Sequence, residues 1–224
     1  MPYQCVATTA AGFVQQLAVN YVARGYYFYV TGTIPEVKDP AKTDRKIIEQ
    51  YGIDISKWAR VRRRKDGKAN IQYLRHDRFY IIIATHGEHA FFRAEERQIR
   101  DIRKRPLRFM DYAIGIGRSR RDRSLHASVR IQREKFRELL AQFRRIAVQR
   151  TVEDLCRELR ALPFEPFAPV RDQFRIILRA VNRLRKTAGL ELVPWNAVRL
   201  FRKPVRVFMT KEKARDKLVT GHPL

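Results

Sequence analysis

The sequence predicts an α+β fold: an N-terminal helix and a mostly antiparallel sheet of about five strands with helices on one face, followed by a C-terminal helical hairpin. Three observations predict it. First, the elements after the N-terminal helix follow one another as strand, helix, hairpin, helix, strand and strand. Second, the hairpin in this series has a tight turn. Third, two helical patterns come after the last strand. Since 45% of the 224 residues are hydrophobic, the chain has enough apolar material for a core.

The first part of the chain predicts a helix, a strand and a second helix. Residues 8–24 carry apolar side chains at helical spacing, and Gly25 suits the left-handed position after a helix. The aromatic and β-branched run 26–36 predicts a buried strand that stops at Pro35. Residues 41–52 predict a short helix that ends at a glycine.

The middle of the chain gives the clearest β signal. Residues 69–75 and 78–85 are strand-like and flank His76 and Asp77, which predicts a hairpin with a tight turn at these two residues. The run Phe79–Ala84 is apolar at every position, so both of its faces should be buried. We therefore expect it to be a central strand.

A helix and two further strands follow the hairpin. We expect the helix over residues 88–104, with Pro106 as its stop. The strands should cover 108–118 and 125–132 and flank an arginine-rich loop.

The rest of the chain predicts helices and a tail. A long helix with alternating charge is expected over about 133–161, a proline-punctuated linker over 163–169, and a second helix over about 170–187. The predicted divisions are an α+β core domain over 1–132, a helical region over 133–201 and a basic polar tail over 202–224.

The charge of the chain narrows the class of partner. Lys and Arg number 48 against 23 Asp and Glu, which gives a formal net charge of +25 and a pI near 10.9. All of this excess lies after residue 40, because Arg24 and Lys38 balance Glu36 and Asp39. A folded chain with this charge predicts a polyanionic partner, so nucleic acid is expected, bound mainly through its phosphates. An acidic protein partner is the alternative.

The sequence disfavours a membrane protein, a zinc-binding protein and a secreted protein. No run of 18 apolar residues exists, so we expect no membrane partner. Two distant cysteines, Cys5 and Cys156, form no zinc-finger pattern or disulfide framework, and no secretory signal is present. A cytoplasmic protein without a cofactor or bound metal is therefore expected. Arginine outnumbers lysine strongly, which suits phosphate and base contacts, although a GC-rich genome would produce the same bias.

The helix over 170–187 is the strongest candidate for the binding surface. Arginines recur on it every four residues and so share one face: Arg171, Arg175, Arg179 and Arg183. Lys186 lies on the same side, and the opposite face is apolar: Phe174, Ile177, Leu178, Val181 and Leu184. Only Asp172 offers a nearby acid, whereas solvated helix faces usually alternate the two charges. This pattern predicts contact with a phosphate backbone.

Three further basic patches are predicted to bind nucleic acid. The first lies beside Trp58 and, on the following strand, Tyr73, which would suit stacking of unpaired bases: Arg60, Arg62, Arg63, Arg64, Lys65 and Lys68. In the alternative, Trp58 only anchors this segment to the core. The other two patches consist of Arg100, Arg103, Lys104, Arg105 and Arg108, and of Arg118, Arg120, Arg121 and Arg123. Four separate patches favour a wrapped surface over a single recognition helix, so RNA is favoured over DNA.

One cluster raises the question of catalysis. His86, Glu88 and His89 follow the central strand, where titratable groups often carry out chemistry. His86 and His89, three residues apart, could ligate a metal with Glu88, but this HxxH spacing is a weak motif and HExxH is absent. A polar helix start with Glu88 in its first turn explains the three residues better. We therefore expect a non-enzymatic protein that clamps structured RNA or DNA, as an accessory factor of a ribonucleoprotein or of a mobile element. The alternative is a metal-dependent nuclease or strand-transfer enzyme that uses this cluster with nearby His76, Asp77 or His126.

Overall fold

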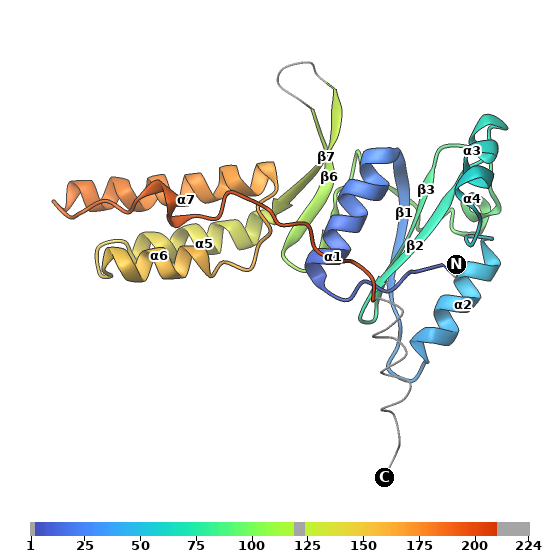
Figure 1. Ribbon diagram of the computed structural model, residues 1–224, viewed down its shortest axis with the longest axis horizontal. Helices are drawn as coiled ribbons and strands as arrows, with labels where there is room; N and C mark the ends of the chain where they lie inside the picture. The colour runs from blue at the N-terminus through green and yellow to red at the C-terminus, as the bar shows by residue number, and fades with distance from the viewer. Residues whose placement is uncertain (1–2, 119–123, 210–224) are drawn as a thin grey trace, which may run out of the picture. The chain divides into compact units, whose positions relative to one another are not determined.

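The computed structural model of the protein describes residues 3–118 and 124–209 (Figure 1). The described residues form two compact units, the first comprising 3–105 with 204–209 and the second 106–118 with 124–203. The boundary lies inside the stretch 1–132 that the sequence assigned to one core domain. The predicted α+β class is confirmed, but the strands form two antiparallel sheets in place of one. In the sequence, Pro106 directly precedes β5 (Leu107–Phe109), the first strand of the second sheet.

The sheet of the first unit has the order β2-β3-β1-β4, with antiparallel pairing throughout. Its strands are β1 (Tyr26–Thr33), β2 (Ile71–His76), β3 (Phe79–Thr85) and β4 (Arg100–Asp101). The apolar strand β3 lies between β2 and β1, as predicted. The hairpin turn falls at Asp77 and Arg78, one residue later than expected, because His76 still pairs with Phe79. Asp77 has a φ of +52°, a left-handed conformation that aspartate tolerates.

The N-terminal helical segment begins at α1 (Ala10–Gln15), continues through the π-helical turn η1 (Gln16–Tyr21) and ends in the 3₁₀ turn η2 (Val22–Arg24). Thr9 caps its start, and Gly25 ends it at a φ of +90°, as predicted. Phe13 of α1 packs edge-on against Phe79 of β3, with 5.8 Å between ring centroids.

The other face of this sheet is covered by helices α2 (Pro40–Gln50) and α4 (Ala90–Ala94). Val30 and Ile82 point to this face, where Ile47 of α2 and Phe91 of α4 pack into the same core cluster. Helices therefore cover both faces of the sheet, whereas the sequence predicted one. Helix α3 (Lys57–Lys65), capped by Ser56, carries the basic run that precedes β2.

A buried polar cluster ties α2 to the sheet. Asp44 of α2 accepts hydrogen bonds from the Nε and Nη2 atoms of Arg75, each at 2.8 Å, and from the hydroxyl of Tyr73 at 2.6 Å. Burial, and then the neighbouring Asp44 carboxylate, raise the pKa of the Tyr73 hydroxyl. Tyr73 is fully buried, so the prediction that its ring stacks on bases beside the α3 patch is wrong.

The predicted helix over 88–104 is also wrong. Only α4 is helical there, and the chain then turns and pairs with β1 as β4. Helical spacing of apolar residues stops at Phe92, so residues 93–98 offer no apolar face to bury. Ile102, in contrast, is completely buried just after the short strand.

The second unit contains a three-stranded sheet in the order β5-β6-β7. Its strands are β5 (Leu107–Phe109), β6 (Tyr112–Arg118) and β7 (Leu125–Ile131). The single strand expected over 108–118 is thus a hairpin that turns at Met110 and Asp111. Met110 has a φ of +47°, a left-handed conformation that methionine rarely adopts, so its residue type does not predict a turn here.

Three helices complete the second unit: α5 (Arg133–Ile146), α6 (Val152–Arg160) and α7 (Ala168–Thr187). The single helix expected over 133–161 is therefore broken. Thr151 starts α6 by accepting a hydrogen bond from the Asp154 N–H at 3.2 Å. Arg185 of α7 donates hydrogen bonds to the carbonyl oxygens of Ala147 and Arg150, at 2.8 and 2.9 Å. It thereby provides donors for backbone carbonyls that have no partner within the helix where α5 ends. The helical hairpin itself is present as predicted.

Part of the expected tail belongs to the first unit. The side-chain amide of Gln15 exchanges hydrogen bonds with the backbone of Val205, at 2.8 and 3.1 Å. The carbonyl of Val207 accepts from the Thr8 N–H at 2.9 Å. Residues 204–209 are therefore held along the N-terminal segment, and residues 210–224 of the predicted tail lie outside the described residues.

Candidate nucleic-acid interface

Helix α7 places three of its four predicted arginines on its exposed side. Arg175, Arg179 and Arg183 are exposed, as is Lys186, and we call these four side chains the α7 face. Within the described residues, the guanidinium groups of Arg179 and Arg183 contact no acid or hydrogen-bond acceptor. Arg175 pairs with Asp172 at 2.9 Å, but both side chains are well exposed, so this pair is weak.

The fourth arginine has a different role. Arg171 is half-buried, and its Nη1 atom donates to the carbonyl oxygens of Pro166 and Leu200, each at 3.4 Å. It therefore holds neighbouring segments of its own chain, although it shares the four-residue spacing. The apolar face also differs from the prediction, since Leu184 is 38% exposed while Arg185 is buried. Arg185 occupies the core position because backbone carbonyls surround its charge.

A groove of about 620 Å³ runs along the α7 face. Helix α7 contributes the four cations and Leu178 to its lining, and the segment after α7 contributes apolar side chains, among them Leu192 and Val198. Trp195, which begins the 3₁₀ turn η3 (Trp195–Ala197), lines the groove and is 70% exposed. We call this feature the Trp195 groove. No acidic side chain is among its lining residues within the part of the chain that the structure describes.

The segment that carries Trp195 is fixed to α7. The Asn182 side chain donates to the Val193 carbonyl at 2.8 Å and accepts from the Val193 N–H at 2.9 Å. Val193 and Ala197, on either side of the tryptophan, are buried. The indole ring is therefore exposed at a position that α7 itself determines.

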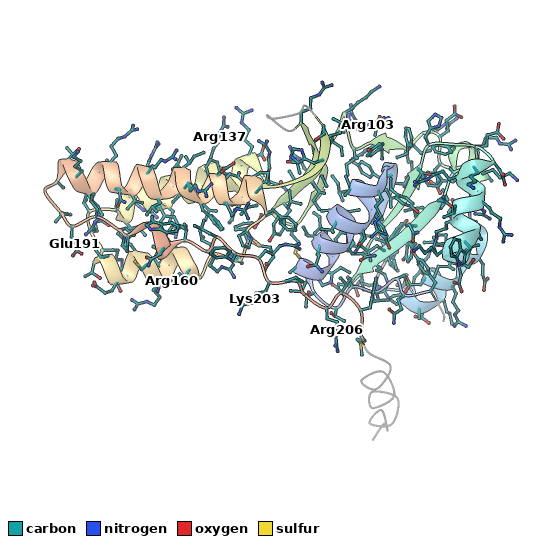
Figure 2. The ribbon with its side chains drawn as sticks, turned by 45° about the horizontal axis from the view of Figure 1, so that its top comes forward. Arg103, Arg137, Arg160, Glu191, Lys203 and Arg206 are labelled. Carbon is teal, nitrogen blue, oxygen red and sulfur yellow. The ribbon has the colours of Figure 1, made fainter. Side chains whose placement is uncertain are left out.

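A second groove, of about 580 Å³, lies between α5 and α7. Arg144 of α5 lines it together with Arg179 and Arg183 and the partly exposed Ile176 and Leu184. Arg179 and Arg183 of the α7 face therefore line both this groove and the Trp195 groove. Other exposed cations of this unit project separately, as Figure 2 shows for Arg137 of α5 and Arg160 of α6.

In the first unit, helix α3 exposes the patch that the sequence placed beside Trp58. Trp58 is 74% exposed, so it does not anchor the segment to the core. Arg62, Arg64, Lys65 and Lys68 are exposed, whereas Arg60 and Arg63 are half-buried. Arg60 and Arg64 donate to the carbonyl oxygens of Ile53 and Arg24, each at 3.3 Å.

One side of α3 borders a cleft of about 890 Å³, which we call the α3 cleft. Its cationic lining residues are Arg62, Arg63, Lys68 and Arg93. Asp66, Glu88 and His89 also line it, so acids alternate with cations there. On the other side of the helix, Arg24, Lys57, Arg60, Arg64 and Lys65 line a further hollow of about 620 Å³.

The members of the third predicted patch belong to both units. Arg103 binds the Asp101 carboxylate with two atoms, at 2.9 and 2.7 Å, and its guanidinium lies 4.9 Å from the centroid of the Tyr27 ring. The hydrogen bond from Arg103 lowers the pKa of Asp101, and the same bond raises the pKa of Arg103. Arg100, Lys104 and Arg105 are exposed in the first unit, whereas Arg108 belongs to the second and lies 3.8 Å from Glu134.

The fourth patch is described only at its first member. Arg118 is exposed at the end of β6. Arg120, Arg121 and Arg123 lie outside the described residues.

In the cluster of His86, Glu88 and His89, the last two residues each have a structural role. Glu88 exchanges backbone hydrogen bonds with Gly67 and Ala69, each at 3.0 Å, which holds this loop against the end of α3. Gly87 has a φ of +130°, and a Cβ there would lie 2.6 Å from the Ala69 nitrogen, so glycine is required. His89 caps α4, because its Nδ1 atom accepts from the Phe91 N–H at 3.0 Å.

The three side chains do not form a metal site. Burial, and then Arg63, lower the pKa of His89, while His86 is exposed beside the Phe28 ring. No group of three His, Cys, Asp or Glu side chains in residues 3–118 and 124–209 is arranged to hold a metal ion. Two of the proposed helpers, His76 and Asp77, lie at the opposite end of β3 from the cluster. The third, His126, belongs to the second unit.

Comparison of the chain with protein-family models, curated proteins and solved structures found no match. Among the described residues, no helix combines the length and apolar character needed to cross a bilayer.

Sequence reasoning missed the residues that complete the grooves. Trp195 stands in a short irregular segment after Pro194, where no periodic pattern marks it. The available signal was a tryptophan shortly after an arginine-rich helix. Arg144 and Arg93 were also missed, because their partners in each hollow come from distant parts of the chain.

Proposed function

We propose that the protein binds nucleic acid, mainly through phosphates, and that structured RNA is its preferred ligand. The observation that carries this proposal is the α7 face, on which Arg179 and Arg183 are exposed without a partner among the described residues. Arginines that bind no acid of their own chain are available to phosphate oxygens, which they bind with two parallel hydrogen bonds.

The net charge supports the same conclusion. A formal charge of +25 gives a field that attracts a polyanion and releases its counterions on binding. The charge is also spread over both units, since exposed cations line the α3 cleft in one and the Trp195 groove in the other. A ligand with many phosphates would satisfy more of these groups than a short acidic peptide.

Two exposed tryptophans favour RNA over a plain duplex. Trp58 and Trp195 each lie beside arginines, and each is at least 70% exposed. Unpaired bases stack on such rings, and structured RNA presents unpaired bases in loops and bulges. A base-paired duplex offers only its phosphates and groove edges.

The test is the salt dependence of binding. Labelled single-stranded and hairpin RNA, and single-stranded and duplex DNA, should be titrated with the full chain by fluorescence anisotropy at several salt concentrations. Contact with about 6–10 phosphates predicts a slope of log affinity against log salt of about −5 to −9 for a duplex, and a shallower slope for single strands. We expect hairpin RNA to bind more tightly than a DNA duplex of equal charge.

The control for this test is an acidic polypeptide. Polyglutamate of matched charge should compete only weakly with the RNA hairpin. A slope shallower than about −2, or competition by polyglutamate equal to that by RNA, would contradict the proposal and favour an acidic protein partner.

A further inference from the structure

The Trp195 groove has three properties that phosphate binding alone does not require. Its lining includes apolar side chains, which we call its floor (Leu178, Leu192, Val198 and Leu200), it has an exposed indole ring, and all its lining cations come from α7. A surface that contacted phosphates alone would need the cations and nothing else. The floor and the ring are suited to a flat, apolar group that carries a negative charge at its edge.

The components of the groove are held in place before any ligand binds. Asn182 lies between Arg179 and Arg183 on α7, and its two hydrogen bonds to Val193 fix the start of the segment that carries Trp195. Past the C-terminal end of α7, the Leu190 N–H donates to the Arg185 carbonyl at 2.9 Å, which turns the chain back along the helix. Ring and cations are therefore positioned by the same helix, and binding requires little ordering.

A nucleotide with an unpaired base matches this arrangement. Its base supplies a flat π-face for Trp195 and the apolar floor, and the phosphates on either side supply charge for the arginines. A paired base cannot enter, because both of its faces are covered by its neighbours. An acidic peptide would match the cations but would leave the floor and the ring without a partner.

We infer that the Trp195 groove binds an unpaired nucleobase of a single-stranded segment, stacked on Trp195, with its flanking phosphates on Arg179 and Arg183. This inference rests on the proposed function and specifies its ligand: single-stranded stretches of RNA rather than continuous duplex.

The experiment uses the fact that the chain contains two tryptophans. In the full-length Trp58→Phe variant, Trp195 is the only source of indole fluorescence. This variant should be titrated with a 12-nucleotide single-stranded RNA, with a blunt RNA duplex of the same length, and with a 12-unit abasic phosphodiester strand. We expect quenching of Trp195 by the single strand in parallel with binding, and binding without quenching for the other two.

A second measurement uses substitutions in the otherwise unchanged chain. Trp195→Ala should weaken binding of the single strand by about tenfold, because one base–aromatic stack is lost, and leave binding of the abasic strand unchanged. Trp195→Phe should restore most of the affinity. Since the ring is largely exposed, none of these variants should change the melting temperature by more than a degree or two.

The outcomes separate the two proposals. If all three ligands bind but none quenches Trp195, and Trp195→Ala binds normally, the groove is not a base site while phosphate binding stands. If none of the ligands binds, the proposed function itself fails. Quenching of Trp195 by polyglutamate that competes with the single strand would overturn the inference in favour of an acidic protein.

Discussion

The α7 face and the surface around α3 are both rich in arginine, but they differ in what those arginines contact. On α7, Arg179 and Arg183 have no partner among the described residues. Around α3, Arg60 and Arg64 donate to backbone carbonyls, and Asp66 and Glu88 stand among the cations of the α3 cleft. Within the described part of the chain, the same residue type is therefore left without a partner in one region and, in part, supports the fold in the other. Counting arginines in a sequence does not separate these two uses.

The sharpest contrast lies within α7 itself, between Arg185 and Arg179. Arg185→Met should lower the free energy of unfolding by about 3 kcal/mol, because the carbonyls of Ala147, Arg150 and Glu191 lose a charged donor. Arg179→Met removes the same charge from an exposed site and should cost less than about 0.5 kcal/mol. Urea denaturation of both variants tests this difference. Equal stability of the two would show that Arg185 does not support the α5–α6 connection.

The next effect concerns binding by the α7 face. Replacing Arg175, Arg179 and Arg183 together by Gln should weaken binding of single-stranded RNA about a hundredfold near 0.1 M salt, and flatten the salt slope by about 2. The measurement is an anisotropy titration at four salt concentrations, with the melting temperature recorded alongside.

The matched control for this variant removes three charges elsewhere in the same unit. Arg137, Arg157 and Arg160 are exposed on α5 and α6, and their replacement by Gln should reduce binding much less. If the two triple variants lose the same affinity, net charge rather than the α7 face determines binding.

The α3 cleft should contribute less than the α7 face. Replacing Arg62, Arg63 and Lys68 by Gln should weaken RNA binding by about fivefold to tenfold, since nearby acids already offset part of their charge. The same titration measures it. A loss greater than that of the α7 variant would reverse the comparison and make the first unit the principal binding surface.

The smallest effect is expected at Arg103, which binds its own chain. Because the pKa of Asp101 is lowered in the fold, the pair stabilises the protein above the ordinary Asp pKa, and this contribution is lost as the pH falls through the lowered value. Arg103→Gln should remove this contribution, which is about 1 kcal/mol or less because the Arg103 side chain is 41% exposed and solvent screens the pair. Urea denaturation at pH 7 and at a series of lower pH values should show a difference between wild type and variant at pH 7 that shrinks as the pH falls through the lowered pKa of Asp101. RNA affinity should change little.

The sequence predicted the elements that a strong local pattern specifies. The α+β class, the central strand β3 with its hairpin and the limits of α7 were all indicated by apolar periodicity and by residues such as Gly25. The break after α5 was not indicated, because the side chain that satisfies it, Arg185, lies far along the chain. The turn at Met110 and the short strand β4 were missed for the same reason, since tertiary pairing decides them.

The candidate site was predictable only in part. The four-residue spacing predicted the row of arginines. It could not show that the Arg171 guanidinium donates hydrogen bonds to the carbonyl oxygens of Pro166 and Leu200. The periodic pattern did not predict the role of Trp195, because its position depends on the hydrogen bonds between the Asn182 side chain and the Val193 backbone. Spacing gives the direction of a side chain on one helix, whereas its availability depends on what the rest of the fold brings near it.

The three carbonyls that Arg185 contacts also determine how the second unit opens. They belong to the end of α5, to the connection before α6 and to the segment after α7, so one guanidinium joins parts of the chain that cannot separate independently. Local fraying of any of these parts would expose the same buried charge. We therefore expect the slowest-exchanging backbone amides of α5, α6 and α7 to share one free energy of opening, so that these three helices unfold together or not at all.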